Sequence, residues 1–183
     1  RGISMPVVVL NADADSFDAM AANRLEPEIY SLRSLHEFAA AVERYGEQRY
    51  PIHVKLDTGM HRLGFVEEEL PALLDALARY GRTVRVASVF AHLCTSDDPA
   101  QDDFTRLQIA RFDRMSSRIA EALPYPVLRH TANSAAIERF PEAQYDMCRL
   151  GLGLYGFGFE HNAALCPVST LRTRIVQIKR LAP

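Results

Sequence analysis

The feature that most constrains the fold is a regular alternation of short β-branched segments with longer helical ones. Strands are predicted at 6–12, 28–31, 52–58, 84–93, 127–134 and 147–158. Between most of them apolar residues recur at helical spacing, most clearly in 31–46, 67–81 and 102–123. Because parallel strands must be joined by a crossover, usually a helix, the alternation predicts an α/β fold with a parallel sheet of about six βα units.

Two architectures share this alternation: an open doubly wound sheet and a (β/α)8 barrel of the TIM type. Polar residues favour the barrel, because they fall at the carboxyl ends of different predicted strands: Lys55 and Asp57, His92, His130 and Asn133, and Arg149. In a barrel those ends converge on one mouth, where the chemistry lies. About six strands instead of eight predict a partial barrel over residues 1–158, containing the last six strands.

Charge and composition exclude several classes of function. The net charge is −2 and no Lys/Arg run occurs, so neither nucleic acid nor a membrane surface is an expected partner. The longest apolar stretches, such as VVVL at 7–10, are too short to span a bilayer. The three cysteines match no metal-binding spacing, which predicts reduced thiols in a cytoplasmic protein without a metal site.

The segment HVKLDTGMHRLGF at 53–65 carries the first candidate residues. Lys55 lies inside an apolar strand, so it is either paired or modified, or it extends its amine out to solvent. Asp57 is either its partner or the start of an Asx turn into Gly59. Arg62 is, from the residues alone, a surface residue after that turn.

Three later segments offer similar pairs of interpretations. His92 follows a buried run and is either a core histidine or a site residue. Asn133 and Ser134 open a helix, so they either cap it or help its N-terminus to bind an anion. The glycines after Arg149 allow a ligand to approach the backbone closely. Barrels often hold a phosphate after their last two strands, which predicts a phosphate site here.

Four segments resemble the alanine racemases, in the same order and across nearly the whole chain: KLDTGMHRLGF (55–65), FAHLCTSDD (90–98), HTANSAA (130–136) and MCRLGLGLYGFG (147–158). The resemblance implies a barrel that binds pyridoxal 5'-phosphate, followed by a β-rich domain, in a cytoplasmic homodimer. Residues 159–183 would then be a linker and the first strand of that domain, because 169–182 alternates like a strand. The implied activity interconverts L-alanine and D-alanine and supplies D-alanine for peptidoglycan.

The resemblance also implies a role for each matching residue. Lys55 matches a lysine that is carbamylated in many members and holds Arg62 beside the cofactor. Arg149 matches the arginine at the pyridine nitrogen, and His92 the histidine that links this arginine to a catalytic tyrosine. The remaining matches are to cofactor-binding positions: Ser134, Gly151 and Leu152 at the phosphate, and His130 and Asn133 nearby.

Both catalytic bases of the family are expected to be absent from this chain. The Schiff-base lysine lies on the first barrel strand and the tyrosine in the partner's C-terminal domain. The chain has only two lysines, Lys55 and Lys179, and it begins at Arg1 already entering an apolar strand. It is therefore predicted to be an inactive fragment of an active parent.

Three alternatives remain open. A metal-dependent amidohydrolase barrel would use a carbamylated Lys55 with His92, His130 and Asp146. A pyridoxal-phosphate carrier of the same fold would bind the cofactor without catalysis. The chain could also be an interaction module, for example one fused to a cell-wall ligase.

Overall fold

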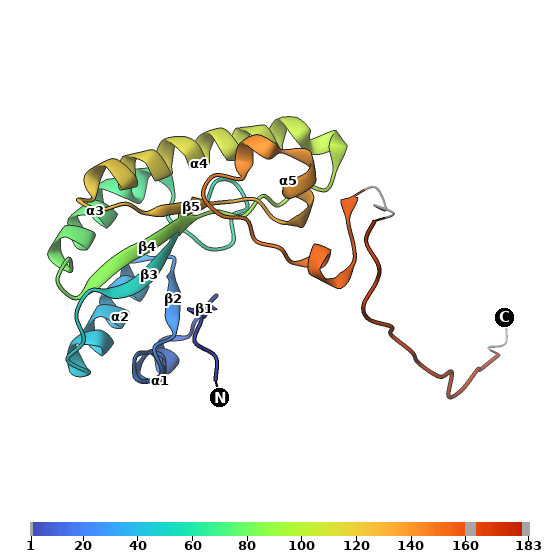
Figure 1. The fold of residues 1–183 in the computed structure, drawn as a ribbon, viewed down its shortest axis with the longest axis horizontal. Coiled ribbons are helices and arrows are strands. Elements are labelled where there is room, and N and C mark those ends of the chain that lie inside the picture. Colours follow the sequence, from blue (N-terminus) through green and yellow to red (C-terminus); the bar gives the residue numbers. More distant parts are fainter. Residues whose placement is uncertain (1, 160–163, 181–183) are drawn as a thin grey trace.

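The protein, described here by a computed structural model, is defined over residues 2–159 and 164–180. Its sheet contains β1 (Val8–Val9), β2 (Glu26–Ile29), β3 (Tyr50–Lys55), β4 (Val84–Phe90) and β5 (Leu128–His130). The strands lie in chain order and every neighbouring pair is parallel (Figure 1). A doubly wound sheet reverses its strand order at a switch point, so the unbroken order confirms a partial barrel.

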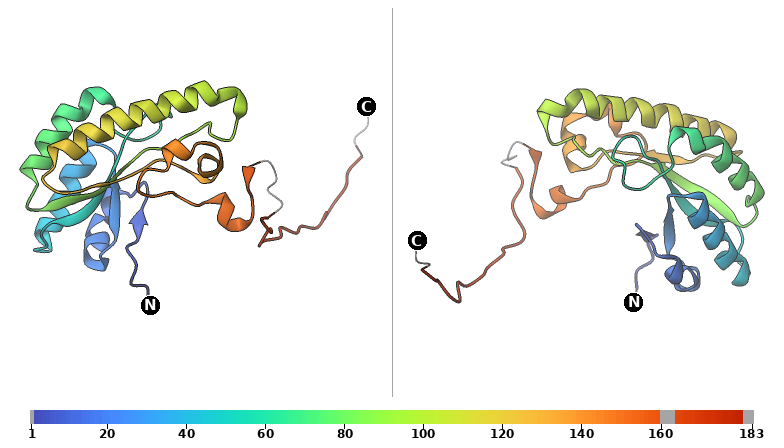
Figure 2. Two further views of the ribbon diagram at one scale, coloured as in Figure 1. Left: turned by 45° about the horizontal axis from the view of Figure 1, so that its top comes forward. Right: turned by 180° about the vertical axis from the view of Figure 1, so that it is seen from behind.

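Helices follow the strands along one side of the curved sheet (Figure 2). The α-helices are α1 (Phe17–Asn23), α2 (Leu32–Arg44), α3 (Leu70–Arg79), α4 (Asp102–Ala122) and α5 (Ser134–Arg139). Short 3-10 helices lie at Ala14–Ser16, Glu67–Glu69, Pro99–Gln101, Pro141–Ala143 and Leu152–Tyr155. Helix α2 begins where the Ser31 side chain accepts a hydrogen bond from the Ser34 amide, which satisfies one of the free amides of the first turn. No helix in the described ranges is both long and apolar enough to cross a membrane.

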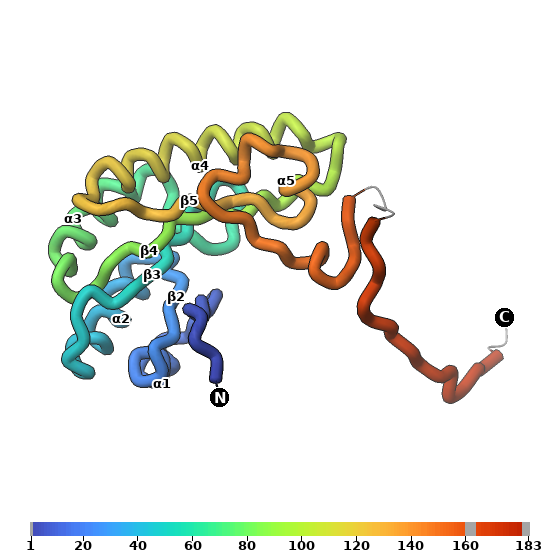
Figure 3. The backbone as a smooth tube through the Cα atoms, viewed as in Figure 1, coloured from blue at the N-terminus to red at the C-terminus, as the bar shows by residue number. Residues whose placement is uncertain are grey.

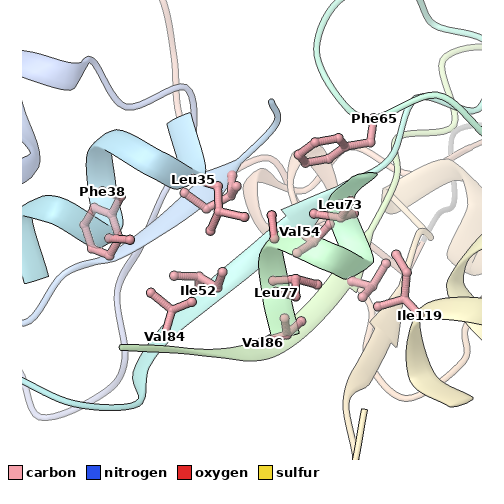
Figure 4. Close-up of a cluster of buried hydrophobic side chains, with 14 of the residues drawn as sticks. Leu35, Phe38, Ile52, Val54, Phe65, Leu73, Leu77, Val84, Val86 and Ile119 are labelled. Atoms are coloured by element: carbon pink, nitrogen blue, oxygen red, sulfur yellow. The ribbon is translucent and has the colours of Figure 1, made fainter. Parts of the chain in front are cut away.

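The apolar core fills the space between the sheet and these helices. Figure 4 shows side chains from α2, β3, β4, α3 and α4 meeting there: Leu35, Phe38, Ile52, Val54, Leu73, Leu77, Val84, Val86 and Ile119. All of them are at most 4% exposed. Burying one such side chain contributes about 1.5–3 kcal/mol, so this face of the sheet supplies much of the stability.

The opposite face of the sheet is polar because side chains alternate along each strand. It carries Glu26 and Glu28 of β2, His53 and Lys55 of β3, Ser88 and Phe90 of β4, and His130 of β5, which contact one another across the strands. A register shift in the β3–β4 pairing decides the place of Ser88. Before the shift, Val84 and Val86 point into the core. After it, Val89 points into the core, so its neighbours Ser88 and Phe90 lie on the polar face.

One predicted strand is wrong within the described residues. Residues 147–158 form a loop and the 3-10 helix Leu152–Tyr155. Arg149 N donates to Ala132 O, which lies beyond the end of β5, so this segment does not pair with the edge of β5 as a sixth strand. Residues 164–180 form no strand here and run away from the sheet (Figure 3). The strand predicted at 169–182, as the start of a following domain, stays a prediction. Strand β1 has two residues where 6–12 was predicted. The domain boundary at 158/159 stays a prediction. Within the predicted linker and strand at 159–183, residues 160–163 and 181–183 lie outside the described ranges.

Candidate active site

The loop after β3 folds back on the strand that precedes it. The Asp57 carboxylate accepts hydrogen bonds from the Gly59 and His61 amides at 2.9 and 3.1 Å, which confirms the Asx-turn interpretation of Asp57. Phe65 N then donates to Lys55 O at 2.9 Å. Gly64 permits this approach, because its φ is +126° and an added Cβ would lie 2.6 Å from Asp57 N.

Lys55 is buried at the end of β3 and is paired with a residue that sequence reasoning did not single out. Its Nζ lies 3.0 Å from Glu28 Oε1, and only 9% and 2% of the two side chains are exposed. The amine also lies 4.8 Å from the centre of the Phe90 ring. Arg62, the partner implied by the family resemblance, is exposed and makes no hydrogen bond or ion pair with any described residue, although it borders the same pocket.

His92 lies just beyond β4 on the pocket wall. Burial, followed by the positive charges of Arg149 and Lys55, lowers the pKa of His92 to about 4, so its ring is neutral near pH 7. The expected contact with Arg149 differs in the structure. Among the described residues it is His130, not His92, that hydrogen-bonds the Arg149 guanidinium.

Helix α5 brings Asn133 and Ser134 to the mouth. Asn133 caps the helix by accepting from Ala136 N at 3.0 Å, which confirms the capping interpretation, and its Nδ2 donates to Leu93 O at 2.9 Å. Ser134 Oγ accepts from the amides of Gly151 and Gly153 at 3.0 and 3.1 Å. The serine hydroxyl therefore gathers two backbone donors of the glycine-rich loop at one point.

Arg149 is the most constrained cation of the mouth. Its Nη2 donates to Ala91 O at 2.6 Å and to Thr131 O at 3.1 Å, and its Nη1 contacts His130 Nδ1 at 2.8 Å. Burial lowers the pKa of Arg149 to about 10, which leaves the guanidinium charged at neutral pH. A rigid, charged donor of this kind fits an acceptor nitrogen or oxygen on a ligand.

One pocket of about 530 Å³ collects the predicted residues, a volume in the usual range for small-molecule sites. Eight of the nine line it: Lys55, Arg62, His92, Asn133, Ser134, Arg149, Gly151 and Leu152. The ninth, His130, lies behind Arg149. Three cations and one carboxylate, that of Asp97, border the space. Together with the Ser134 hydroxyl, they fit an anionic ring compound such as a pyridoxal phosphate.

The structure does not support the amidohydrolase alternative, because the aspartate that it requires lies outside the pocket. Asp146 does not line the pocket; its carboxylate accepts from Arg129 N at 2.8 Å at the start of β5. Over residues 2–159 and 164–180, no group of three or more His, Cys, Asp or Glu side chains is arranged to hold a metal ion.

Sequence reasoning missed the polar residues beneath the mouth, chiefly Glu28, His53, Ser88 and Phe90. A signal for two of them was present, because Glu26 and Glu28, like His53 and Lys55, alternate with apolar residues in EPEI and IHVK. Such alternation indicates one polar face on a strand. Ser88 and Phe90 had no comparable signal, because their orientation depends on the shifted register of β3 and β4.

The fold and the pocket define a class: a partial parallel βα barrel with a cation-lined ligand site at the carboxyl ends of its strands. The family described as "Alanine racemase, N-terminal domain" matches residues 1–158. The alanine racemase of Symbiobacterium thermophilum is 35% identical over 99% of this chain and 48% of its own length. The chain therefore belongs to the alanine racemase family, and it spans about half the length of such relatives.

Solved structures agree with this assignment. The alanine racemase of Clostridium difficile 630 superimposes with a TM-score of 0.77 at 28% identity, over 85% of this chain and 40% of that one. An alanine racemase from Bartonella henselae with covalently bound pyridoxal phosphate has a TM-score of 0.74 over 88% of this chain and 45% of that one. At 21% identity the second likeness supports the fold alone.

Proposed function

We propose that this chain is the part of an alanine racemase that holds the phosphate and ring of pyridoxal 5'-phosphate, and that the whole protein interconverts L-alanine and D-alanine. The observation that carries the proposal is one pocket in which Arg149, Ser134 and the loop at Gly151 and Leu152 meet two further cations, Lys55 and Arg62. Membership of the alanine racemase family supports the same conclusion.

When bound, pyridoxal phosphate stabilises the negative charge that forms at the α-carbon of an amino acid as its proton leaves. The residues of this chain bind and orient it. Arg149 would donate to the ring nitrogen and keep that nitrogen unprotonated, because a guanidinium donates and does not accept hydrogen bonds. Ser134 with the amides of Gly151 and Leu152 would bind the phosphate. His130 supports Arg149 from behind, and Asn133 fixes the helix start from which Ser134 projects.

Two further assignments concern the rest of the pocket wall. We propose that His92, neutral near pH 7, accepts or passes a hydrogen bond at the mouth, and that Arg62 faces the ring's phenolic oxygen. Lys55 remains the proposed position of carbamylation. The modification would have to replace the ion pair that the Lys55 amine makes with Glu28. A carbamate would bring a second buried anion beside the Glu28 carboxylate, so the pairing seen here opposes the modification.

Racemisation needs a base on each face of the α-carbon. We expect neither from this chain, because Lys55 is paired with Glu28 and Lys179 lies in an exposed segment away from the pocket. The whole protein is proposed to obtain them elsewhere and to act as a cytoplasmic homodimer that supplies D-alanine for peptidoglycan. Fusion to a cell-wall ligase is compatible with this proposal.

The cofactor site is tested by titrating pyridoxal 5'-phosphate into the chain while its absorbance is monitored. Borohydride reduction and mass spectrometry then test for a covalent adduct. We expect reversible binding without an adduct, and about tenfold weaker binding by Arg149→Lys, because lysine loses the planar, multiply bonded guanidinium. Arg82→Lys, an exposed control, should bind like the unmodified chain. A reducible adduct on Lys55, or no binding by the folded chain, would contradict the assignment.

A further inference from the structure

A continuous chain of hydrogen bonds runs beneath the pocket across four strands and ends at Arg149. Glu26 Oε2 lies 2.6 Å from His53 Nε2, and His53 Nδ1 lies 2.6 Å from Ser88 Oγ. Ser88 Oγ lies 3.0 Å from His130 Nε2, and His130 Nδ1 lies 2.8 Å from Arg149 Nη1. Each residue except Arg149 comes from a different strand, in the order β2, β3, β4 and β5.

With both imidazole rings neutral, the two ends determine the direction of every bond in this chain. Arg149 can only donate, so His130 Nδ1 accepts and the proton of the neutral His130 ring is on Nε2. His130 Nε2–H then donates to Ser88 Oγ, and the Ser88 hydroxyl donates to His53 Nδ1. The remaining His53 proton, on Nε2, donates to Glu26, whose carboxylate can only accept. Both histidines are thereby assigned the same tautomer, with the proton on Nε2.

Burial makes this arrangement hard to replace by water. The exposed fractions of His53, Ser88 and His130 are 7%, 0% and 5%. A buried donor or acceptor that loses its partner costs about 1–3 kcal/mol, so each member constrains the next. In the other tautomer, His130 would direct an N–H at the Arg149 guanidinium and leave Ser88 without its donor.

Arg149 is held differently on its two sides. Nη2 is bound by the carbonyls of Ala91 and Thr131, whereas Nη1 depends on the His130 ring and, at 3.3 Å, on the His130 carbonyl. The tautomer of His130 therefore decides whether Nη1 keeps its shorter bond, the one to the ring, or only the longer one to the His130 carbonyl.

We propose that Glu26, His53 and Ser88 are positioning residues: through His130 they hold the Arg149 guanidinium in one orientation at the pocket wall. None of the three lines the pocket, so they act on a ligand only through Arg149. The relevance of this chain to pyridoxal phosphate rests on the proposed function, but the hydrogen-bonded chain itself does not.

Nuclear magnetic resonance of the uniformly 15N-labelled 183-residue chain tests the proposal without a ligand. Two-bond 15N–1H spectra report the tautomer of each histidine, and the Nη resonances of Arg149 report rotation about its Nε–Cζ bond. We expect His53 and His130 as Nε2–H tautomers and separate, slowly exchanging Nη1 and Nη2 signals. His130 protonated on Nδ1 in the unmodified chain would overturn the proposal before any variant is made.

Ser88→Ala removes the hydroxyl between the two imidazoles and keeps both rings. We expect a mixture of His130 tautomers and at least tenfold faster Arg149 rotation, with Ser88→Cys between the two. Ser116→Ala is the matched control, because Ser116 is also fully buried and also contacts an arginine, Arg129, but lies outside this chain. An unchanged His130 tautomer and rotation rate in Ser88→Ala would show that Arg149 is held without these residues.

A parallel titration with pyridoxal 5'-phosphate separates this inference from the proposed function. If the unmodified chain binds the cofactor, Ser88→Ala should bind it roughly tenfold more weakly, the effect of about one lost hydrogen bond. If the unmodified chain does not bind it, the cofactor assignment fails, while the tautomer and rotation measurements still decide the positioning role. A changed rotation rate with unchanged affinity would overturn the claim that these residues act on a ligand through Arg149.

Discussion

The buried ion pair of Lys55 and Glu28 allows a quantitative test of the inner face of the sheet. The charged atoms are 3.0 Å apart and both side chains are at least nine-tenths buried. At an effective dielectric constant of about 20, Coulomb's law gives an attraction of roughly 5 kcal/mol at this distance. Much of that attraction offsets the free energy needed to remove both charges from water. The pair therefore adds little net stability, whereas removal of one partner destabilises the protein strongly, because an unpaired charge stays buried.

Removal of one partner is the informative change. Glu28→Gln leaves the ammonium of Lys55 without a counter-charge, and we expect a loss of about 3 kcal/mol, at the lower end of the 3–5 kcal/mol typical of such changes. The lower end applies because the amide still accepts a hydrogen bond and the Phe90 ring stays close to Nζ. Lys55→Met leaves a buried carboxylate bonded only to Asn11 N, with a similar loss. The double variant should recover most of the stability, because no buried charge remains.

Urea unfolding of the four proteins measures this cycle. With a slope of about 1–3 kcal/mol per molar urea, each single variant should lower the midpoint by roughly 1–3 M. The coupling free energy between positions 28 and 55 should exceed about 2 kcal/mol. Additive effects, within about 0.5 kcal/mol, would refute the reasoning, because they would mean that the two groups do not depend on each other.

Three further predictions concern stability at low pH, two glycine substitutions and the carbamylation of Lys55. Burial, followed by Arg149, lowers the pKa of His130 to about 3. Because the unfolded state takes up this proton near pH 6.5 and the folded state does not, His130 alone should lower the free energy of unfolding by about 1.7 kcal/mol between pH 6.5 and 5, and His130→Gln should remove this part of the slope in urea titrations. Gly64→Ala should cost clearly more stability than Gly46→Ala in thermal unfolding, because both have positive φ but only at position 64 would the added Cβ meet backbone atoms, at 2.6 Å. With 13C-bicarbonate, the 13C carbamate signal should be stronger in Glu28→Gln than in the unmodified chain, and an equal signal would show that the carboxylate does not oppose the modification.

The regular elements were predictable where local pattern and tertiary packing agree. Helices predicted at 31–46 and 102–123 are Leu32–Arg44 and Asp102–Ala122, because their apolar faces pack on the sheet as the spacing requires. The failure at 147–158 has a physical cause. Apolar or alternating residues mark a potential strand, but a strand forms only where a neighbouring backbone accepts its hydrogen bonds.

The parallel βα architecture, the family and the rim of the pocket all follow from the amino-acid sequence alone. Residues at the carboxyl ends of parallel strands must converge, so eight of the nine predicted site residues line one pocket without any knowledge of register. The pairs of residues beneath that rim depend instead on the three-dimensional arrangement of the strands. Lys55 meets Glu28 and not Arg62, and Arg149 meets His130 and not His92. These contacts join residues 27 and 19 positions apart, and a register shift in β4 turns Ser88 toward His130. Such pairings depend on how strands align with one another, which local sequence patterns do not specify.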